Sequence, residues 1–193
     1  FNPEANLYPK NTSTPGIYEL DRRIEKIIKN PEIKKGVLLV KEKKFTQAEN
    51  LFRSLIIQLD GNEKKLVYYY LGEIAYLENR FDEAIVLFDK ALSIEEKFFE
   101  ALVKRAMSSI KVGNYNDALV YLKKAALINA HSFTVNFELG KIYFLKNHIE
   151  EALNAFNLAI EITEDLRASL YKALCLYKLD RIKDAVSIFE KIA

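Results

Sequence analysis

The stretch Asn79–Ile94, NRFDEAIVLFDKALSI, decides the fold because its pattern of large and small residues recurs along the chain. Ala84 lies near its start, Phe81 precedes that alanine by three residues, and Phe88 follows it by four. The same alanine returns at intervals of 34, 34 and 33 residues, as Ala118, Ala152 and Ala185. A constant period of roughly 20–50 residues indicates repeated structural units that stack on one another.

Each copy contains two helical patterns separated by a short turn. The turn carries a residue that tolerates a left-handed backbone, the conformation in which many helices end. These residues are Asn79, Gly113, Asn147 and Asp180, and the earliest copy has Lys43 in their place. Lysine suits that conformation less well, so the earliest copy fits the pattern least.

A small residue precedes each repeated alanine by twelve positions. These residues are Gly72, Ala106, Gly140 and Ala173, with Gly36 in the earliest copy. Two helices whose backbones approach closely need glycine or alanine at the contact, and a large residue such as Phe88 fills the adjoining space. A single pair of helices cannot bury both of its faces, so each pair is expected to pack on the next.

At these positions the chain resembles the tetratricopeptide repeat (TPR) family. The family's first helix carries a large or aromatic residue, then Leu-Gly, then an aromatic residue, and its second helix carries alanines around an aromatic residue. The copy that fits best has Tyr68, Leu71, Gly72, Tyr76, Phe81, Ala84, Phe88 and Ala91. The family's proline at the end of each repeat is missing, and Arg105 and Lys172 replace the consensus leucine in two copies.

The repeat and the resemblance together predict an all-α fold, a right-handed α-solenoid of about five TPR-like helix-turn-helix repeats over residues 31–193. The repeats are expected at about 31–62, 63–96, 97–130, 131–164 and 165–193. Their helices are expected at about 31–43, 45–59, 63–78, 81–94, 97–111, 115–128, 131–146, 149–162, 165–178 and 181–192. Residues 1–16 are predicted to form an extended N-terminal arm, and residues 17–30 a helix that caps the first repeat.

The resemblance also implies which side chains face a partner, because the first helix of each pair lines the concave wall in this family. Tyr69, Glu73 and Tyr76 form one row on such a helix. Tyrosine is common at interfaces because it combines a large apolar face with a hydroxyl group. The predicted peptide-binding groove consists of Tyr69, Tyr70, Glu73, Tyr76, Val103, Lys104, Met107, Ile110, Phe137, Lys141, Phe144, Tyr171, Leu174 and Tyr177. The alternative for each of them is simple packing against neighbouring helices.

Composition and motifs argue against several functional classes. The 29 basic and 27 acidic residues leave a net charge of +2, not the strongly basic balance typical of nucleic-acid binding. No apolar run approaches the roughly 18 residues that span a bilayer. Cys175 is the single cysteine and lies between two leucines, which indicates a core residue. We therefore predict no catalytic residue, no metal site and no cofactor.

Some TPR proteins hold the C-terminal carboxylate of a peptide with lysines and asparagines on successive first helices. The corresponding inner positions of this chain begin with Ile33, Val37, Tyr69 and Tyr70, so the clamp is absent. We instead expect a non-catalytic scaffold that binds a protein or peptide segment through apolar anchors and helps to assemble a complex. Two alternatives stay open: an accessory or targeting region of a larger enzyme or cell-envelope assembly machine, and a groove for a small apolar ligand.

The ends of the chain add expectations about partners and location. The predicted arm, residues 1–16, is a candidate to occupy a groove, and the last repeat has no capping helix after it. Both features are candidates for self-association. The chain begins at Phe1 and not at a methionine, and its first segment is polar. These two features favour a periplasmic or lipid-tethered envelope protein slightly over a cytoplasmic one.

Overall fold

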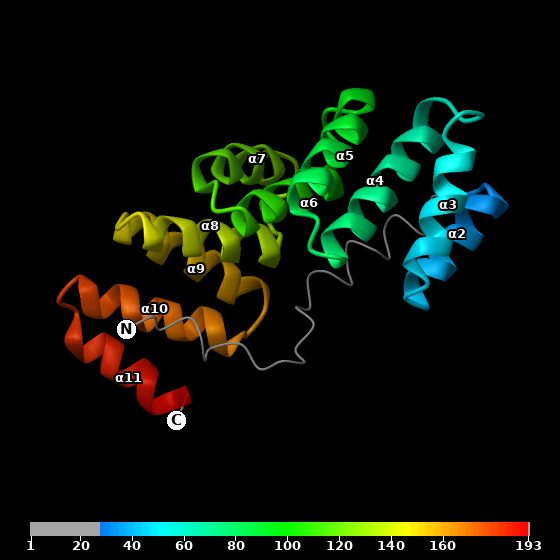
Figure 1. The fold of residues 1–193 in the computed structure, drawn as a ribbon. Helices are drawn as coiled ribbons and strands as arrows, with labels where there is room; N and C mark the ends of the chain where they lie inside the picture. The colour runs from blue at the N-terminus through cyan, green and yellow to red at the C-terminus, as the bar shows by residue number, and fades with distance from the viewer. Residues whose placement is uncertain (1–27, 193) are drawn as a thin grey trace.

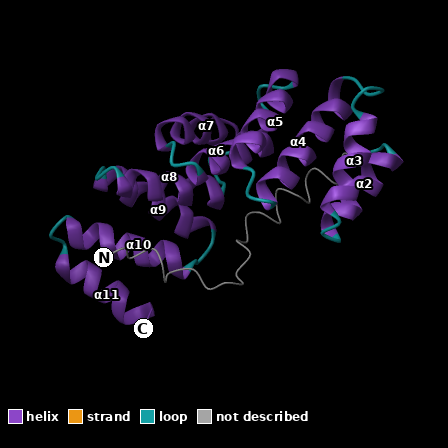
Figure 2. Cartoon of the chain, in the orientation of Figure 1, coloured by secondary structure: helices purple, strands orange, loops and turns teal. Residues whose placement is uncertain are grey.

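The sequence repeat is seen as a row of helix pairs that stack side by side along an arc (Figure 1). The structure is a computed structural model and describes residues 28–192, which form helices and no strand (Figure 2). The pairs are α2 (Pro31–Lys41) with α3 (Phe45–Leu55), α4 (Gly61–Leu77) with α5 (Phe81–Ile94), α6 (Phe99–Lys111) with α7 (Tyr115–Ile128), α8 (Phe133–Leu145) with α9 (Ile149–Ile162), and α10 (Leu166–Lys178) with α11 (Ile182–Ile192). The predicted all-α solenoid is confirmed.

The helices begin and end within two residues of the predicted positions, with one exception. Helix α3 ends at Leu55 rather than near residue 59, because residues 56–58 form a turn. Ile28, Lys29 and Asn30 are not helical, so the predicted capping helix does not extend to residue 30. The rest of that helix and the predicted arm lie outside the described residues. Asn30 caps α2, since its side chain accepts hydrogen bonds from the N–H groups of Glu32 and Ile33.

The predicted turns all adopt the left-handed conformation. The φ angle is 62° at Asn79, 60° at Asn147, 59° at Asp180 and 81° at Gly113. Lys43 adopts it too, with φ at 58°, so the earliest copy follows the same geometry despite its less suitable residue. The next residue then donates to a carbonyl five positions earlier, as in the 2.8 Å bond from Arg80 N to Ala75 O. This arrangement satisfies carbonyl groups that the helix end would otherwise leave unpaired.

Close contact between the two helices of a pair explains the recurring small residues. A Cβ atom added at Gly72 would lie 2.8 Å from the ring of Phe88, and one added at Gly140 would lie 2.7 Å from Phe156. Such contacts are too short for carbon atoms, so an alanine at Gly72 or Gly140 would force the phenylalanine ring to move. The third pair combines Ala106 with the smaller Leu122 in one core cluster.

The stack presents its first helices along one side. First helices of neighbouring pairs contact one another, α2 with α4, α4 with α6 and α8 with α10. We call the surface that the first helices share the inner wall, after the position that the family resemblance implies for it.

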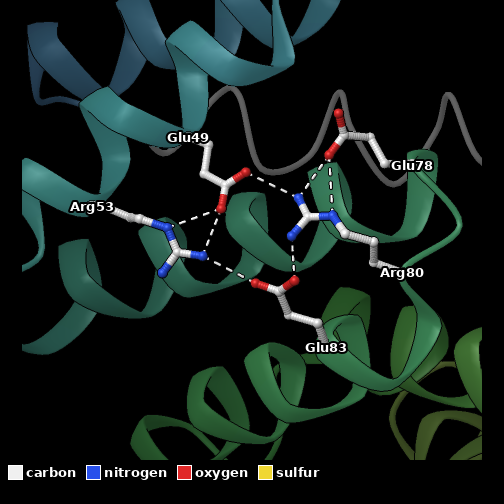
Figure 3. A network of polar contacts seen from close by, with 5 residues as sticks. All are labelled: Glu49, Arg53, Glu78, Arg80 and Glu83. Carbon is white, nitrogen blue, oxygen red and sulfur yellow. Dashed lines mark hydrogen bonds and ion pairs between the residues drawn. The ribbon is translucent and has the colours of Figure 1, made fainter.

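On the outer side, a network of charged residues links α3 to the start of α5 (Figure 3). Glu49 on α3 accepts from Arg53 at 2.6 Å and from Arg80 at 3.0 Å. Glu83 accepts from Arg53 at 3.0 Å and also contacts Arg80, which reaches back to Glu78. These side chains are partly exposed, so solvent screens the network and each pair adds little stability.

Candidate functional site

The fourteen predicted groove residues fall into three groups in the structure. Buried are Tyr69, Tyr70, Glu73, Val103, Lys104 and Phe137. Half-buried are Tyr76, Met107, Ile110, Lys141, Phe144, Tyr171 and Leu174. Tyr177 is 61% exposed. The inner wall is thus a largely closed surface from which the second and third groups emerge.

Tyr69, Tyr70 and Val103 of the predicted groove are buried in this structure. The ring centroid of Tyr69 lies 5.8 Å from that of Phe88 and 5.3 Å from that of Phe98, and its side chain is fully buried. Tyr70 stacks on Phe52 of the preceding pair at 5.8 Å, and Val103 belongs to a core cluster. Helical spacing placed these side chains on the predicted groove-facing side of each helix but could not show which aromatic rings of neighbouring elements enclose them.

Charged side chains meet on the wall where α4, α6 and α8 lie next to one another. Lys104 of α6 donates to Oε1 of Glu73 on α4 at 2.7 Å, and its Nζ lies 5.7 Å from the ring centroid of Tyr76. On α8, Lys141 pairs with Glu138 at 3.0 Å. We call these five residues the charged cluster.

Tyr76 lies at the centre of the charged cluster. Burial raises the pKa of its phenol well above the ordinary value, and the negative charges of Glu138 and Glu73 raise the pKa further, while Lys141 opposes them. Two carboxylates, Glu73 and Glu138, and two lysines, Lys104 and Lys141, therefore surround Tyr76, and each carboxylate is paired with one of the lysines.

The wall also holds two buried polar atoms without a hydrogen-bond partner among residues 28–192. One is Oε2 of Glu73, whose residue is 7% exposed, and the other is Oγ1 of Thr134, whose residue is 6% exposed. An unpaired buried polar group costs about 1–3 kcal/mol. Such atoms in a native structure call for a partner, and on an inner wall that partner can be a bound molecule.

Beyond the charged cluster, aromatic rings connect α8 to α10. Tyr171 lies 6.0 Å from Phe137, 5.8 Å from Phe144 and 5.1 Å from Phe156, ring centroid to ring centroid. Nζ of Lys178 lies 5.1 Å from the Phe144 ring, which places a cation beside this aromatic group. Half-buried Phe144 and Tyr171 and exposed Tyr177 give this end of the wall an accessible apolar face.

Sequence reasoning missed two residues of the wall. Thr134 lies one helical turn before Phe137, and Arg167 lies one turn before Tyr171. The guanidinium group of Arg167 lies 5.2 Å from the centroid of the Phe137 ring. Extending the inward-facing row by one turn toward the start of each first helix would have found both.

Arg105, which departs from the family consensus, lies away from the wall in a closed polar group. It donates to Asp89 at 3.0 Å, contacts Asp117 and Ser109, and stacks on Tyr121 at 4.3 Å. Its charge is thereby compensated although the residue is only 8% exposed. Arg105, which replaces the consensus leucine, therefore has a structural role.

Among residues 28–192, no group of three or more histidine, cysteine, aspartate and glutamate side chains is arranged to hold a metal ion. Within the same range, no helix has both the length and the apolar character to cross a bilayer. A cavity near the starts of α2 and α4 is lined by both charged and apolar residues, among them Glu63, Lys65, Ile33 and Leu66.

Family comparison agrees with this geometry. Tetratricopeptide repeat models match residues 66–98 and 109–174, which together make up about half of the chain. The chain belongs to the tetratricopeptide repeat family. Proteins of this family are generally non-catalytic scaffolds for protein interactions.

Curated relatives of this TPR protein are distant and longer. A TPR repeat-containing protein of Methanocaldococcus jannaschii is 26% identical over 180 residues, which are 93% of this chain and 31% of the relative. The DnaJ homolog subfamily C member 7 homolog of Dictyostelium discoideum is 25% identical over 83% of this chain and 32% of its own. The chain thus spans about a third of the length of these relatives.

Solved structures share the fold. MamA from Desulfovibrio magneticus superposes with a TM-score of 0.74 at 17% identity, over 86% of this chain and 95% of that one. YrrB, described as a TPR protein with an unusual peptide-binding site, superposes with a TM-score of 0.72 at 20% identity, over 90% of both chains. At these identities the likeness establishes the solenoid architecture alone.

Proposed function

We propose that this TPR protein is a non-catalytic scaffold that binds a protein or peptide segment along the wall of its first helices and helps to assemble a complex. The observation that carries the proposal is the series of half-buried or exposed apolar residues on successive first helices. Tyr76, Met107, Phe144 and Tyr177 occupy this series from α4 to α10. No nucleic acid or membrane insertion is part of the proposal.

The physical basis of such binding is the apolar surface that remains accessible on the wall. Burying it under a partner contributes about 25 cal/mol per Å², from which the costs of association must be subtracted. Aromatic residues give much of that area at a small entropy cost, and the lysines and glutamates beside them orient the partner. The proposal is further supported by YrrB, a protein of the same architecture that is described as having a peptide-binding site.

Chemical cross-linking followed by affinity capture tests the proposal. The double variant Phe144→Ala, Tyr177→Ala removes accessible apolar area from the wall. The control Val120→Ala, Leu127→Ala removes exposed apolar side chains from the outer helix α7, where these residues are 52% and 89% exposed. We expect the wall variant to lose its principal partner and the control to keep it. Equal recovery by both variants and the wild type contradicts the proposal.

A second candidate function follows from the length of the relatives. Because the chain spans about a third of those it matches, the repeats also suit an accessory or targeting region of a larger enzyme or cell-envelope assembly machine. A native gene that encodes further domains would favour this alternative, and cell fractionation would test the proposed location in the envelope.

A further inference from the structure

The charged cluster on the inner wall combines a buried ion pair with an unused hydrogen-bonding position. Lys104 occupies Oε1 of Glu73 at 2.7 Å, whereas Oε2 is buried and has no partner among the described residues. A carboxylate oxygen can only accept hydrogen bonds. The missing partner must therefore be a donor.

The carboxylate of Glu73 favours a positively charged donor over a neutral one. Lys104 and Lys141 balance the charges of Glu73 and Glu138 in the cluster, but the pairing of Glu73 with Lys104 uses only one of the two carboxylate oxygens. Hydrogen bonds between an ionised donor and a carboxylate are roughly twice as strong as those between neutral groups. The cluster therefore offers more to an ammonium or guanidinium group than to an amide.

Apolar groups next to the cluster suit the rest of such a side chain. Met107 follows Lys104 by one helical turn on α6, and both Met107 and Tyr76 are half-buried. The hydrocarbon portions of lysine and arginine pack well on apolar surface while their charged ends find polar partners. A tyrosine ring also attracts a cation placed over its face.

We propose that Glu73, together with Glu138 and Tyr76, forms a specificity site for a lysine or arginine side chain of the bound segment. Oε2 of Glu73 accepts the hydrogen bond from that side chain. This inference rests on the proposed function, since it names the chemistry of the segment that the first helices bind. It differs from a carboxylate clamp, because here the protein supplies the acid and the partner supplies the base.

Selection from a random peptide library tests the site without knowledge of the natural partner. Displayed twelve-residue peptides are selected on the full chain, on Glu73→Gln and on the control Glu150→Gln, whose side chain is exposed on outer helix α9. The dissociation constant of the best peptide is then measured with its basic residue intact and replaced by citrulline, a neutral isostere of arginine. Circular dichroism and urea unfolding check that each variant is folded.

We expect peptides selected on the wild type and on Glu150→Gln to be enriched in lysine or arginine at one position. Citrulline should weaken their binding at least about tenfold, and Glu73→Gln should bind both forms about equally. Peptides that bind without a basic preference, or a preference that Glu73→Gln retains, overturn the inference and leave the proposed function standing. Failure to select any peptide overturns both. The comparison of arginine with citrulline on the wild-type protein decides the matter even if Glu73→Gln does not fold.

Discussion

Lys104 and Glu73 connect two successive repeats across the inner wall, with 2.7 Å between Nζ and Oε1. The residues are 1% and 7% exposed, respectively, so both charges are almost withdrawn from water. A buried charge is strongly destabilising unless it is paired, and removal of one member leaves the other without compensation. Each member of this pair is therefore essential to the other.

The substitution Lys104→Met is expected to lower the free energy of unfolding by about 3 kcal/mol because it leaves Glu73 charged and unpaired. Urea denaturation followed by circular dichroism measures the change. The double variant Lys104→Met, Glu73→Leu is the control, since it removes both charges and should regain most of the stability. A Lys104→Met protein as stable as the wild type would show that the pair is not compensating.

Gly72→Ala is expected to lower the free energy of unfolding by about 1–3 kcal/mol, the usual cost of overpacking. In an unobstructed helix the same change would stabilise by roughly 1 kcal/mol. The opposite sign follows from the added Cβ, which would lie 2.8 Å from the Phe88 ring.

The third repeat provides the control for Gly72, because there Ala106 shares a cluster with Leu122. The double variant Gly72→Ala, Phe88→Leu reproduces that combination. The double variant should lose less free energy of unfolding than the two single variants lose together, because the leucine makes room for the new methyl group. Strict additivity in urea unfolding would contradict the steric explanation.

Asp165 is expected to stabilise the protein in a pH-dependent way. Burial alone would raise the pKa of Asp165, but hydrogen bonds from Arg167 and from the backbone N–H of Ala168 outweigh it and lower the pKa below the ordinary 3.8. The carboxylate also caps α10. A lowered pKa means that its contribution is complete above the unfolded-state pKa and declines as pH falls through the folded-state pKa.

The substitution Asp165→Ala should therefore cost about 1 kcal/mol at pH 7, the usual value of an N-cap. The difference from the wild type should narrow below about pH 3.8. Asp165→Asn retains a capping oxygen without the charge, so its stability should follow pH less steeply than that of the wild type. Urea unfolding from pH 7 to pH 2.5 measures the stability of both variants and of the wild type. A difference between Asp165→Ala and the wild type that stays constant with pH would rule out the charged capping role of Asp165.

Cys175 is expected to react slowly in the native protein. The residue is fully buried, and burial raises the pKa of the thiol to about 11 although the charge of Lys178 opposes this rise. The thiolate is the reactive form, so both access and ionisation oppose modification at pH 8. Reaction with a thiol-specific chromogenic reagent should be slow without denaturant and fast in urea. Rapid reaction under native conditions would mean that α10 opens readily.

The periodicity of the sequence was sufficient for the architecture because each repeated feature has a local cause. Asn79 and Asp180 end helices through their own backbone conformation, which depends little on distant parts of the chain. Gly72 and Phe88 lie within one helix pair, so their spacing already specifies the contact between them. Helix α3 was predicted too long because the pattern does not show where the turn after Leu55 begins.

The sequence by itself determined the helix pairs, their turns and the inward direction of the first-helix side chains, since these follow from backbone preference and a fixed period. Only the tertiary structure decided which inward side chains remain accessible. Tyr69 and Tyr177 both belong to the predicted groove, yet one is enclosed by Phe88 and Phe98 and the other is 61% exposed. The pairing of Glu73 with Lys104 likewise depends on how successive repeats meet. Accessibility and charge pairing are properties of neighbours distant along the chain, and no single repeat encodes them.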